Sequence, residues 1–285
     1  MAGPAPVSAR WRSTAFQRKE YQHLSSRSTT TAPLVSLHTH TDLSLCAKPE
    51  MTLDAAVALA IEDGYHTLGF TDHIHIAEVT DRPAHAQQLR EYRSRRDKAD
   101  WPVRVLIGGE FEVQGKGAMV ECDEILEVCE FVVVAPNHYH LCWVDSVGDT
   151  CAETAAHELD CFETAINWPH TDIIAHPYVG KVQKPEHEPN AMWDATDKSR
   201  IRDLIALAKE RNVAMEIQPA LWFHPDRAGR VAELIDMWLD GGGLISLGSD
   251  AHTLSALRTW TERYGEIVER FDLTAEKMWL PSSDK

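Results

Sequence analysis

Short runs of apolar residues recur along the chain, and segments with a helical pattern separate them. Each run has four or five residues, which suits a strand better than a helix. The runs are almost continuously apolar, as is typical of parallel strands that are buried on both faces. The predicted strands are residues 34–37, 66–70, 103–107, 131–135, 171–175, 213–217 and 244–247.

Helices are predicted between these strands, over residues 53–63, 83–99, 152–167, 198–211 and 228–239. Thr52 is a suitable N-cap for the first of them. Strands that alternate with helices are typical of parallel βα units. Polar residues follow one strand end after another, whereas a doubly wound sheet would gather them at a single switch point. We therefore predict an α/β fold, a distorted (β/α)7 barrel.

Residues 1–33 differ from the rest of the chain. They are rich in Ser, Thr, Ala and Arg, with Glu20 as their one acidic residue, and they contain no clear strand. This composition predicts a flexible N-terminal arm, followed by a single domain over residues 34–285.

Charge and composition exclude several classes of function. The chain has 285 residues and a net charge of −16, which argues against a nucleic-acid partner. It contains no apolar run near the roughly 20 residues of a membrane-spanning helix. Its six cysteines form no CxxC pair and no secretory signal is evident, so we expect a cytoplasmic protein. The sequence does not determine the oligomeric state.

Metal-ligating residue types follow the predicted strands. His38 and His40 can reach one point, because side chains two residues apart in an extended segment lie on the same side. Histidines and carboxylates also follow the other strands, and neutral imidazoles with carboxylates are transition-metal ligands. We therefore predict a polynuclear metal site. Its candidate ligands are His38, His40, His73, Glu110, His138, His176, Asp250 and His252.

The motifs HTH, GFTDH, GGEFE, PNH, AHP and GSDAH occur here in order and with a distinctive spacing. In this the chain resembles the PHP (polymerase and histidinol phosphatase) superfamily, and most of all its stand-alone histidinol-phosphatase-like branch. The resemblance covers about residues 34–271. It implies a distorted (β/α)7 barrel with up to three divalent ions, in agreement with the strand count.

The resemblance also implies a role for each ligand. His38, His40, Glu110 and Asp250 would hold the first ion. Glu110 would bridge to a second ion, which His138 and His176 complete. His73 and His252 would hold the third, and Cys46 occupies the position where the family carries the remaining histidine.

Three interpretations of Cys46 stay open. Its thiolate could replace the imidazole and favour a softer ion such as zinc or iron over manganese. Alternatively Cys46 is a bystander and His75 takes the position, or the third site is weak and two ions suffice.

The expected reaction is hydrolysis of a phosphate monoester by in-line attack of a metal-bridging hydroxide. Asp72 is a candidate catalytic residue, either as the acceptor that orients a ligand histidine or as an aid to proton transfer. The expected substrate is a small phosphorylated metabolite such as histidinol phosphate. Candidate substrate contacts on loops after the strands are Lys181, Trp222, His224 and Arg227.

Other classes of function remain open. The same ligands could hold iron and support an oxidative reaction, because nitrogen and oxygen ligands with open positions suit dioxygen chemistry. A non-catalytic PHP module is a further alternative. The amidohydrolases also begin with His-x-His, but they usually need a bridging lysine at the fourth strand, and residues 131–138 contain none.

Overall fold

The computed structural model describes residues 32–178, 188–219 and 228–281. The predicted arm, apart from its last two residues, lies outside the described residues. The strands are β1 (Val35–Ser36), β2 (Thr67–Phe70), β3 (His73–Ile74), β4 (Arg104–Ile107), β5 (Gly109–Gly115), β6 (Ala118–Met119), β7 (Val132–Ala135), β8 (Ile173–Ile174), β9 (Ala214–Ile217) and β10 (Ile245–Leu247). The helices are α1 (Leu53–Glu62), α2 (Arg82–Lys98), α3 (Asp123–Leu126), α4 (Cys151–Asn167), α5 (Pro189–Ala195), α6 (Lys198–Arg211), α8 (Ala228–Asp240) and α9 (Leu254–Arg270).

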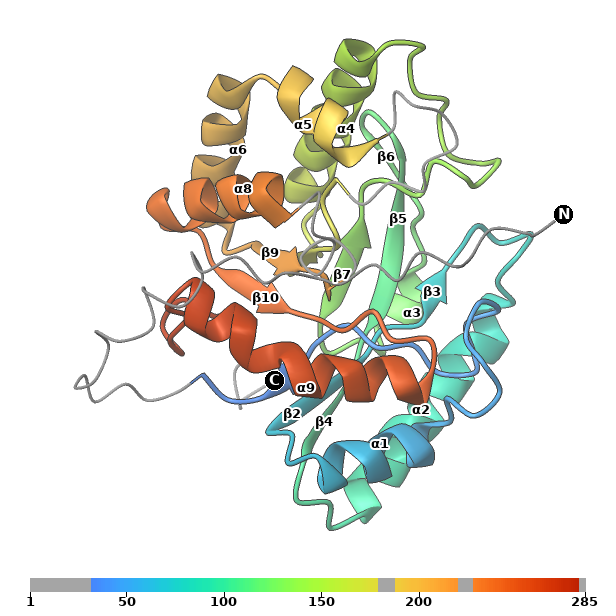
Figure 1. Cartoon of the computed structure of the whole chain (residues 1–285). Coiled ribbons are helices and arrows are strands. Elements are labelled where there is room, and N and C mark those ends of the chain that lie inside the picture. Colours follow the sequence, from blue (N-terminus) through green and yellow to red (C-terminus); the bar gives the residue numbers. More distant parts are fainter. Residues whose placement is uncertain (1–31, 179–187, 220–227, 282–285) are drawn as a thin grey trace, which may run out of the picture. The chain divides into compact units, whose positions relative to one another are not determined.

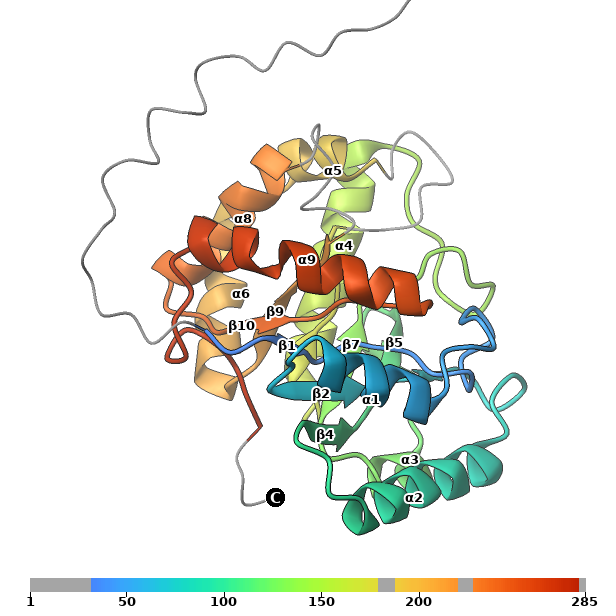
Figure 2. The same cartoon turned by 60° about the horizontal axis from the view of Figure 1, so that its bottom comes forward.

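The parallel strands close into a barrel, with helices packed around it (Figures 1 and 2). One sheet has the order β1-β2-β4, and the path of the other runs β10-β9-β8-β7-β5-β3. Two continuous segments join them, since β2 leads into β3 and β4 leads into β5 after short breaks. The amide of Leu37 donates to the carbonyl of Leu247 at 2.9 Å, which connects β1 with β10. Within the described residues this makes seven parallel segments, so the predicted α/β barrel is confirmed.

Alternation along the strands separates an outer and an inner face. Outward residues such as Val132 and Val134 join the large core between the barrel and its helices. Inward residues such as Val133 and Ala214 form a second, smaller core with Phe131 and Trp279. The inward positions of β5 and β9 include the buried acids Glu110, Glu112 and Glu216, so a polar centre lies next to this apolar base.

Most of the predicted elements are confirmed, and several are missed. Helix α6 has the predicted bounds, and the Thr52 hydroxyl caps α1 by accepting from the amide of Ala55 at 3.3 Å. The prediction omitted the β5–β6 hairpin, α3, α5 and α9. Helix α9 lies across the barrel (Figure 2) and buries Leu257, Trp260 and Ile267. Among the described residues, every helix is too short or too polar to cross a membrane.

We predict that Gly108→Ala destabilises the fold, because Gly108, between β4 and β5, lies very close to Phe131 at the start of β7. A Cβ atom on Gly108 would lie 2.6 Å from the backbone oxygen of Phe131 and 2.8 Å from its ring. Overpacking of this kind should lower the free energy of unfolding by about 1–3 kcal/mol. Urea denaturation would measure the change.

Gly265→Ala is the matched control, because a Cβ atom there meets nothing within 4 Å in the exposed middle of α9. It should raise the free energy of unfolding by about 0.5–1 kcal/mol. Equal effects of the two substitutions would contradict the close approach of Gly108 to Phe131.

Candidate metal centre

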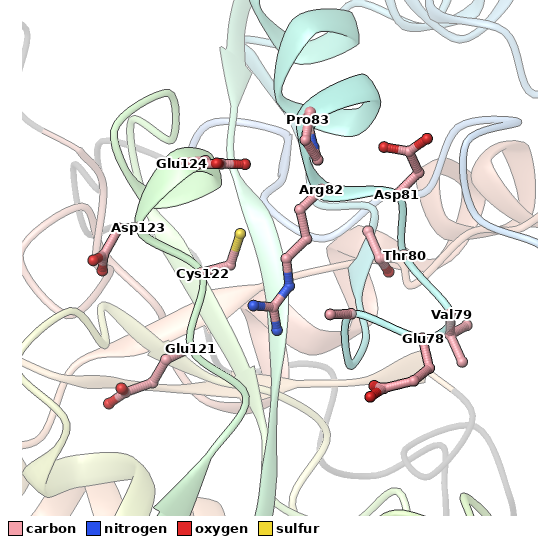
Figure 3. Close-up of a pocket in the computed structure, with 11 residues that line it drawn as sticks. Glu78, Val79, Thr80, Asp81, Arg82, Pro83, Glu121, Cys122, Asp123 and Glu124 are labelled. Atoms are coloured by element: carbon pink, nitrogen blue, oxygen red, sulfur yellow. The ribbon is translucent and has the colours of Figure 1, made fainter.

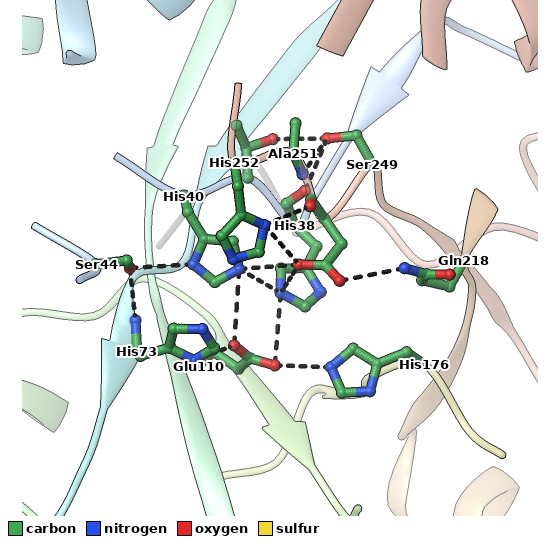
Figure 4. Close-up of polar contacts among 12 residues, drawn as sticks. His38, His40, Ser44, His73, Glu110, His176, Gln218, Ser249, Ala251 and His252 are labelled. Carbon is green, nitrogen blue, oxygen red and sulfur yellow. Dashed lines mark hydrogen bonds and ion pairs between the residues drawn. The ribbon is translucent and has the colours of Figure 1, made fainter. Parts of the chain in front are cut away.

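Glu110 lies at the centre of the site, and its carboxylate is fully buried at the top of the barrel (Figure 4). β5 directs it inward, and imidazoles from the ends of other strands surround it. Among the described residues, five imidazole nitrogens lie within 3.7 Å of its two oxygens. These atoms are Nε2 of His176 (2.9 Å), His38 (3.5 Å), His138 (3.7 Å) and His40 (3.7 Å), and Nδ1 of His73 (2.6 Å).

Asp250 brings a second carboxylate to the same cluster. Its Oδ1 lies 3.0 Å from His40 Nε2 and 3.6 Å from His38 Nε2. The Gln218 side chain donates to its Oδ2 at 3.1 Å, and the backbone oxygen of Asp250 contacts His252 Nδ1 at 2.9 Å. The sequence-predicted ligands from both ends of the chain therefore meet in one place.

Four of the imidazoles, those of His38, His40, His138 and His176, are anchored through Nδ1, so that Nε2 faces the cluster. His38 Nδ1 lies 2.9 Å from Glu216 Oε1, and His138 Nδ1 lies 3.0 Å from Glu112 Oε1. Carboxylate oxygens accept hydrogen bonds, so each Nδ1 donates its proton to one of them, and Nε2 is the nitrogen left to face the cluster. Metal-ligating histidines typically donate their other ring N–H to a partner of this kind, which fixes the tautomer.

Asn137 orients His176 in the same way. The Asn137 amide nitrogen donates to the backbone oxygen of His176 at 3.0 Å and to buried Glu158 at 3.1 Å. The two donations leave its oxygen, 3.1 Å from His176 Nδ1, as the acceptor. His176 Nε2 is then free to face Glu110.

Asp72 acts on the site through Ser44. The Asp72 carboxylate accepts from the amide of Thr41 at 2.7 Å, from the Thr41 hydroxyl at 2.7 Å and from the Ser44 hydroxyl at 2.6 Å. Because the single Ser44 proton goes to Asp72, Ser44 Oγ must accept from His40 Nδ1 at 3.1 Å. Asp72 thus positions His40 indirectly, and its own oxygens are held by Thr41 and Ser44.

The backbone at the strand ends is unusual where it presents ligands. His176 has φ = 26° and Asp250 has φ = 49°, in the left-handed region that few non-glycine residues adopt. Gly248 allows a close approach, since a Cβ atom there would lie 2.0 Å from Glu216 Oε1 and 2.6 Å from His38 Cβ. The absence of a side chain at Gly248 thus lets Glu216 approach His38.

The electrostatics of the cluster call for positive charge. Burial would raise the pKa of Glu110, but nearby His73, His38 and His138 hold it well below its usual range. Burial would lower the pKa values of His38 and His73, yet nearby carboxylates raise that of His38, and Glu110 and Cys46 raise that of His73, both well above the usual value. Positive charge is thus favoured at this cluster, and bound cations would supply it.

Two buried atoms fit a metal ligand role directly. His73 Nδ1 and Glu110 Oε2 lie 2.6 Å apart, yet neither makes a hydrogen bond to any described residue. Two metal-ligand atoms that face a common cation lie close together without a hydrogen bond between them. In a hydrogen-bonded pair, by contrast, the proton of one atom points at the other. The groups His38–His40–Glu110, His73–Glu110–His138 and His40–His73–His252 each bring their ligand atoms within 4.8 Å of one another.

Cys46 lies beside the third of these groups. Although burial opposes it, interactions with the imidazoles of His252 and His73 lower the pKa of the Cys46 thiol to about 6. The amide of Lys48 donates to the backbone oxygen of His252 at 2.9 Å, which ties the Cys46 loop to the end of β10. His75 stacks on His73, and its Nδ1 lies 2.7 Å from Glu112 Oε1, so His73, His75 and Glu112 form a further group with ligand atoms within 4.8 Å of one another.

Comparison with known proteins now adds to this geometry. The family model described as the PHP domain matches residues 36–220, more than half of the chain. The chain belongs to the PHP domain family. The expected family and barrel are thereby confirmed.

Two relatives of this PHP domain extend the comparison. A probable phosphatase of Proteus mirabilis is 32% identical over 116 residues, which are 40% of this chain and 45% of that protein. The match thus spans less than half of the relative's length. The histidinol phosphate phosphatase of Lactococcus lactis, solved with zinc, L-histidinol and phosphate, aligns with a TM-score of 0.54 and 16% identity. That alignment covers 82% of this chain and 95% of the other, and it shows the common fold.

Several residues of this PHP domain site were missed by the sequence analysis. Glu216 was overlooked because it belongs to an apolar strand, although an acid within such a strand is itself a signal, and Glu112 was overlooked because only Glu110 of the GGEFE motif received a role. Asn137 and Ser44 lie within or near the quoted motifs, but only the contacts reveal their roles. The predicted substrate contacts Lys181, Trp222, His224 and Arg227 lie outside the described residues.

A separate concavity of about 810 Å³ lies between the segment before α2 and the segment before α3 (Figure 3). Arg82 extends into it as the one cationic residue of its lining. A strongly acidic wall repels phosphate, so this concavity is a poor site for a phosphate ester. Its acidic residues are Glu78, Asp81, Glu121, Asp123 and Glu124.

We predict that Ser44→Ala weakens metal binding. Without the hydroxyl, His40 Nδ1 loses its acceptor, and the lone pair no longer stays on Nε2. Loss of such a partner lowers metal affinity by about 10- to 100-fold. Titration in metal-buffered solution measures the affinity, and ¹⁵N NMR of the metal-free protein reports the His40 tautomer.

Ser94→Ala is the control for this substitution, because Ser94 is exposed on α2. It should leave both measurements unchanged. A Ser44→Ala protein with wild-type affinity and an unchanged tautomer would show that Ser44 does not position His40.

Proposed function

We propose that this PHP domain is a metal-dependent phosphoesterase that hydrolyses a small phosphate monoester. The observation that carries the proposal is the buried Glu110 carboxylate, with imidazole nitrogens within 3.7 Å of both oxygens. One carboxylate shared by ligands on two sides suits a pair of closely spaced ions. Paired ions of this kind are typical of phosphatases.

The proposed ligand sets follow the family pattern. His38, His40, Glu110 and Asp250 would hold one ion, and Glu110 would share a second with His138 and His176. A third ion would lie between His73, His252 and Cys46. The groups of ligand atoms within 4.8 Å of one another support the central part of this arrangement.

When bound, such ions supply positive charge for phosphate oxygens and lower the pKa of a water to near neutrality. The chain's residues provide the rest. Glu110 and Asp250 keep the site anionic, so that it retains cations. Glu216, Glu112, Asn137 and Ser44 hold the imidazoles in the tautomer that leaves Nε2 free. Asp72 positions Ser44 and is proposed as a positioning residue.

The two relatives support a phosphate ester as the substrate. The Lactococcus lactis structure contains zinc, L-histidinol and phosphate, and the Proteus mirabilis protein is a probable phosphatase. The proposed substrate is therefore a small phosphorylated metabolite, with histidinol phosphate as the first compound to assay.

The direct test is metal analysis of anaerobically purified protein together with a panel of phosphate monoesters. We expect two to three zinc, manganese or iron ions per chain and release of inorganic phosphate. Iron with dioxygen consumption and no phosphate release would support an oxidative enzyme instead. A metal-free protein without turnover after reconstitution would support a non-catalytic module.

We predict that Glu110→Gln lowers turnover at least about 100-fold, because loss of even an outer contact to a ligand costs about 10- to 100-fold. An amide is neutral and is a poor bridge between two cations. Steady-state kinetics and metal stoichiometry would measure the effect, and circular dichroism would check the fold. A variant that keeps its metals and most of its rate would contradict the bridging role.

We predict that Cys46→Ser removes up to one ion per chain, because a hydroxyl is a weaker ligand than a thiolate. Cys46→His should restore the ion and shift the preference toward manganese, since imidazole is less soft. In the unmodified protein, bound metal should protect Cys46 from alkylation, and a chelator should expose it.

Cys142 is the internal control for labelling, because it is an exposed free cysteine. It should react equally with and without chelator. Unchanged metal stoichiometry in Cys46→Ser, with chelator-independent labelling of Cys46, would exclude Cys46 as a ligand.

A further inference from the structure

Glu112 is a fully buried carboxylate that accepts from three side chains. Its Oε1 accepts from His75 Nδ1 at 2.7 Å and from His138 Nδ1 at 3.0 Å, and its Oε2 accepts from Trp143 Nε1 at 2.8 Å. Three N–H groups thus converge on the two oxygens of one carboxylate, which offers an acceptor to each of them.

The three donors have different surroundings. His138 faces Glu110 through Nε2 at 3.7 Å and belongs to the proposed metal centre. His75 stacks on His73, with ring centroids 5.2 Å apart and planes at 17°. Trp143 meets the His75 ring edge-on at 5.2 Å. One carboxylate thus connects a metal ligand to a pair of aromatic rings at the edge of the site.

The pair His75–Trp143, which we call the rim wall, is partly exposed. The His75 side chain is 15% exposed, and Trp143 is half-buried. An ester whose phosphate lies near His73 and His138 must place its organic group beside these ligands. The rim wall offers that group two aromatic rings, and hydrogen bonds to Glu112 fix the orientation of both.

We propose that Glu112 is a positioning residue that couples the metal ligand His138 to the rim wall, and that the rim wall contacts the organic group of the substrate. The inference rests on the proposed function. It adds a determinant of substrate preference that is formed by residues outside the proposed ligand set.

The number of acceptor atoms allows a sharp test. Three N–H donors need both carboxylate oxygens, whereas a glutamine at this position has one acceptor oxygen and an NH₂ group. In Glu112→Gln, the amide oxygen can accept from the two imidazoles, but the NH₂ group then faces the Trp143 N–H. Two hydrogen-bond donors would meet there with no acceptor between them. Trp143→Phe removes that donor, so the amide can then serve both imidazoles without opposition.

The experiment measures zinc affinity in metal-buffered solution for Glu112→Gln, Trp143→Phe and the double variant. Glu112→Gln should lower the affinity about 10- to 100-fold in the wild-type background. In the Trp143→Phe background the loss of affinity should be at least threefold smaller, because the amide oxygen then has only the two imidazole donors to accept from. Equal losses in both backgrounds, or none in either, would overturn the coupling.

Glu121→Gln is the matched control, because Glu121 is exposed and follows the same hairpin. It should leave zinc affinity unchanged. Thermal unfolding of each variant measures a general loss of stability. A change at the metal centre differs from it, because only that change should become smaller in the Trp143→Phe background.

The rim wall is tested with phenyl phosphate and with inorganic phosphate as an inhibitor. Trp143→Ala should raise the KM for phenyl phosphate about 3- to 10-fold with little change in kcat. It should leave inhibition by inorganic phosphate unchanged, because that ligand has no organic group. Unchanged KM would overturn the contact. Absence of turnover with any ester would instead overturn the proposed function, while the zinc affinities still decide the role of Glu112.

Discussion

The burial of the Glu110 carboxylate is the constraint on which the rest of the site depends. An ionised carboxylate removed from water costs several kcal/mol unless positive charge or hydrogen bonds compensate it. Here the compensation comes from imidazoles at the ends of several strands. The barrel must therefore bring these strand ends together for the carboxylate to be tolerated, and bound cations would relieve the same cost. Stability and metal binding are thus expected to be linked.

The barrel meets this constraint in layers. Val133, Ala214 and Phe131 fill its base, and the acids Glu112 and Glu216 occupy inward positions further along the strands. Each acid accepts a hydrogen bond from the Nδ1 of a ligand histidine, which turns the Nε2 of that imidazole toward the centre. The buried carboxylates thus have two uses, since some attract cations and others set the tautomer of the ligands. An apolar base below them keeps water from approaching from the far end of the barrel.

Sequence periodicity predicted the barrel because its strands are short, apolar and regularly separated. The ligand set was also accessible, since parallel strands end at one edge and the ligand residue types follow those ends. The contacts that orient the ligands were not accessible. Glu216 reaches His38 across 178 positions of sequence, and Ser44 meets Asp72 only after the chain folds back. Such pairs depend on register and side-chain direction, which apolar patterning does not encode.

Cys46 illustrates how the fold can prepare a ligand that the family pattern does not supply. Its loop is held on one side by Ser44, whose oxygen accepts from the amide of His73 at 3.1 Å. On the other side, Lys48 donates to the backbone oxygen of His252 at 2.9 Å. The loop is thus fixed to the same two residues that would share an ion with the thiolate. Under the proposed assignment, a shorter, softer side chain would replace an imidazole here because the backbone brings it to His73 and His252. The proposed third site therefore depends on the geometry of this loop as much as on the thiol itself.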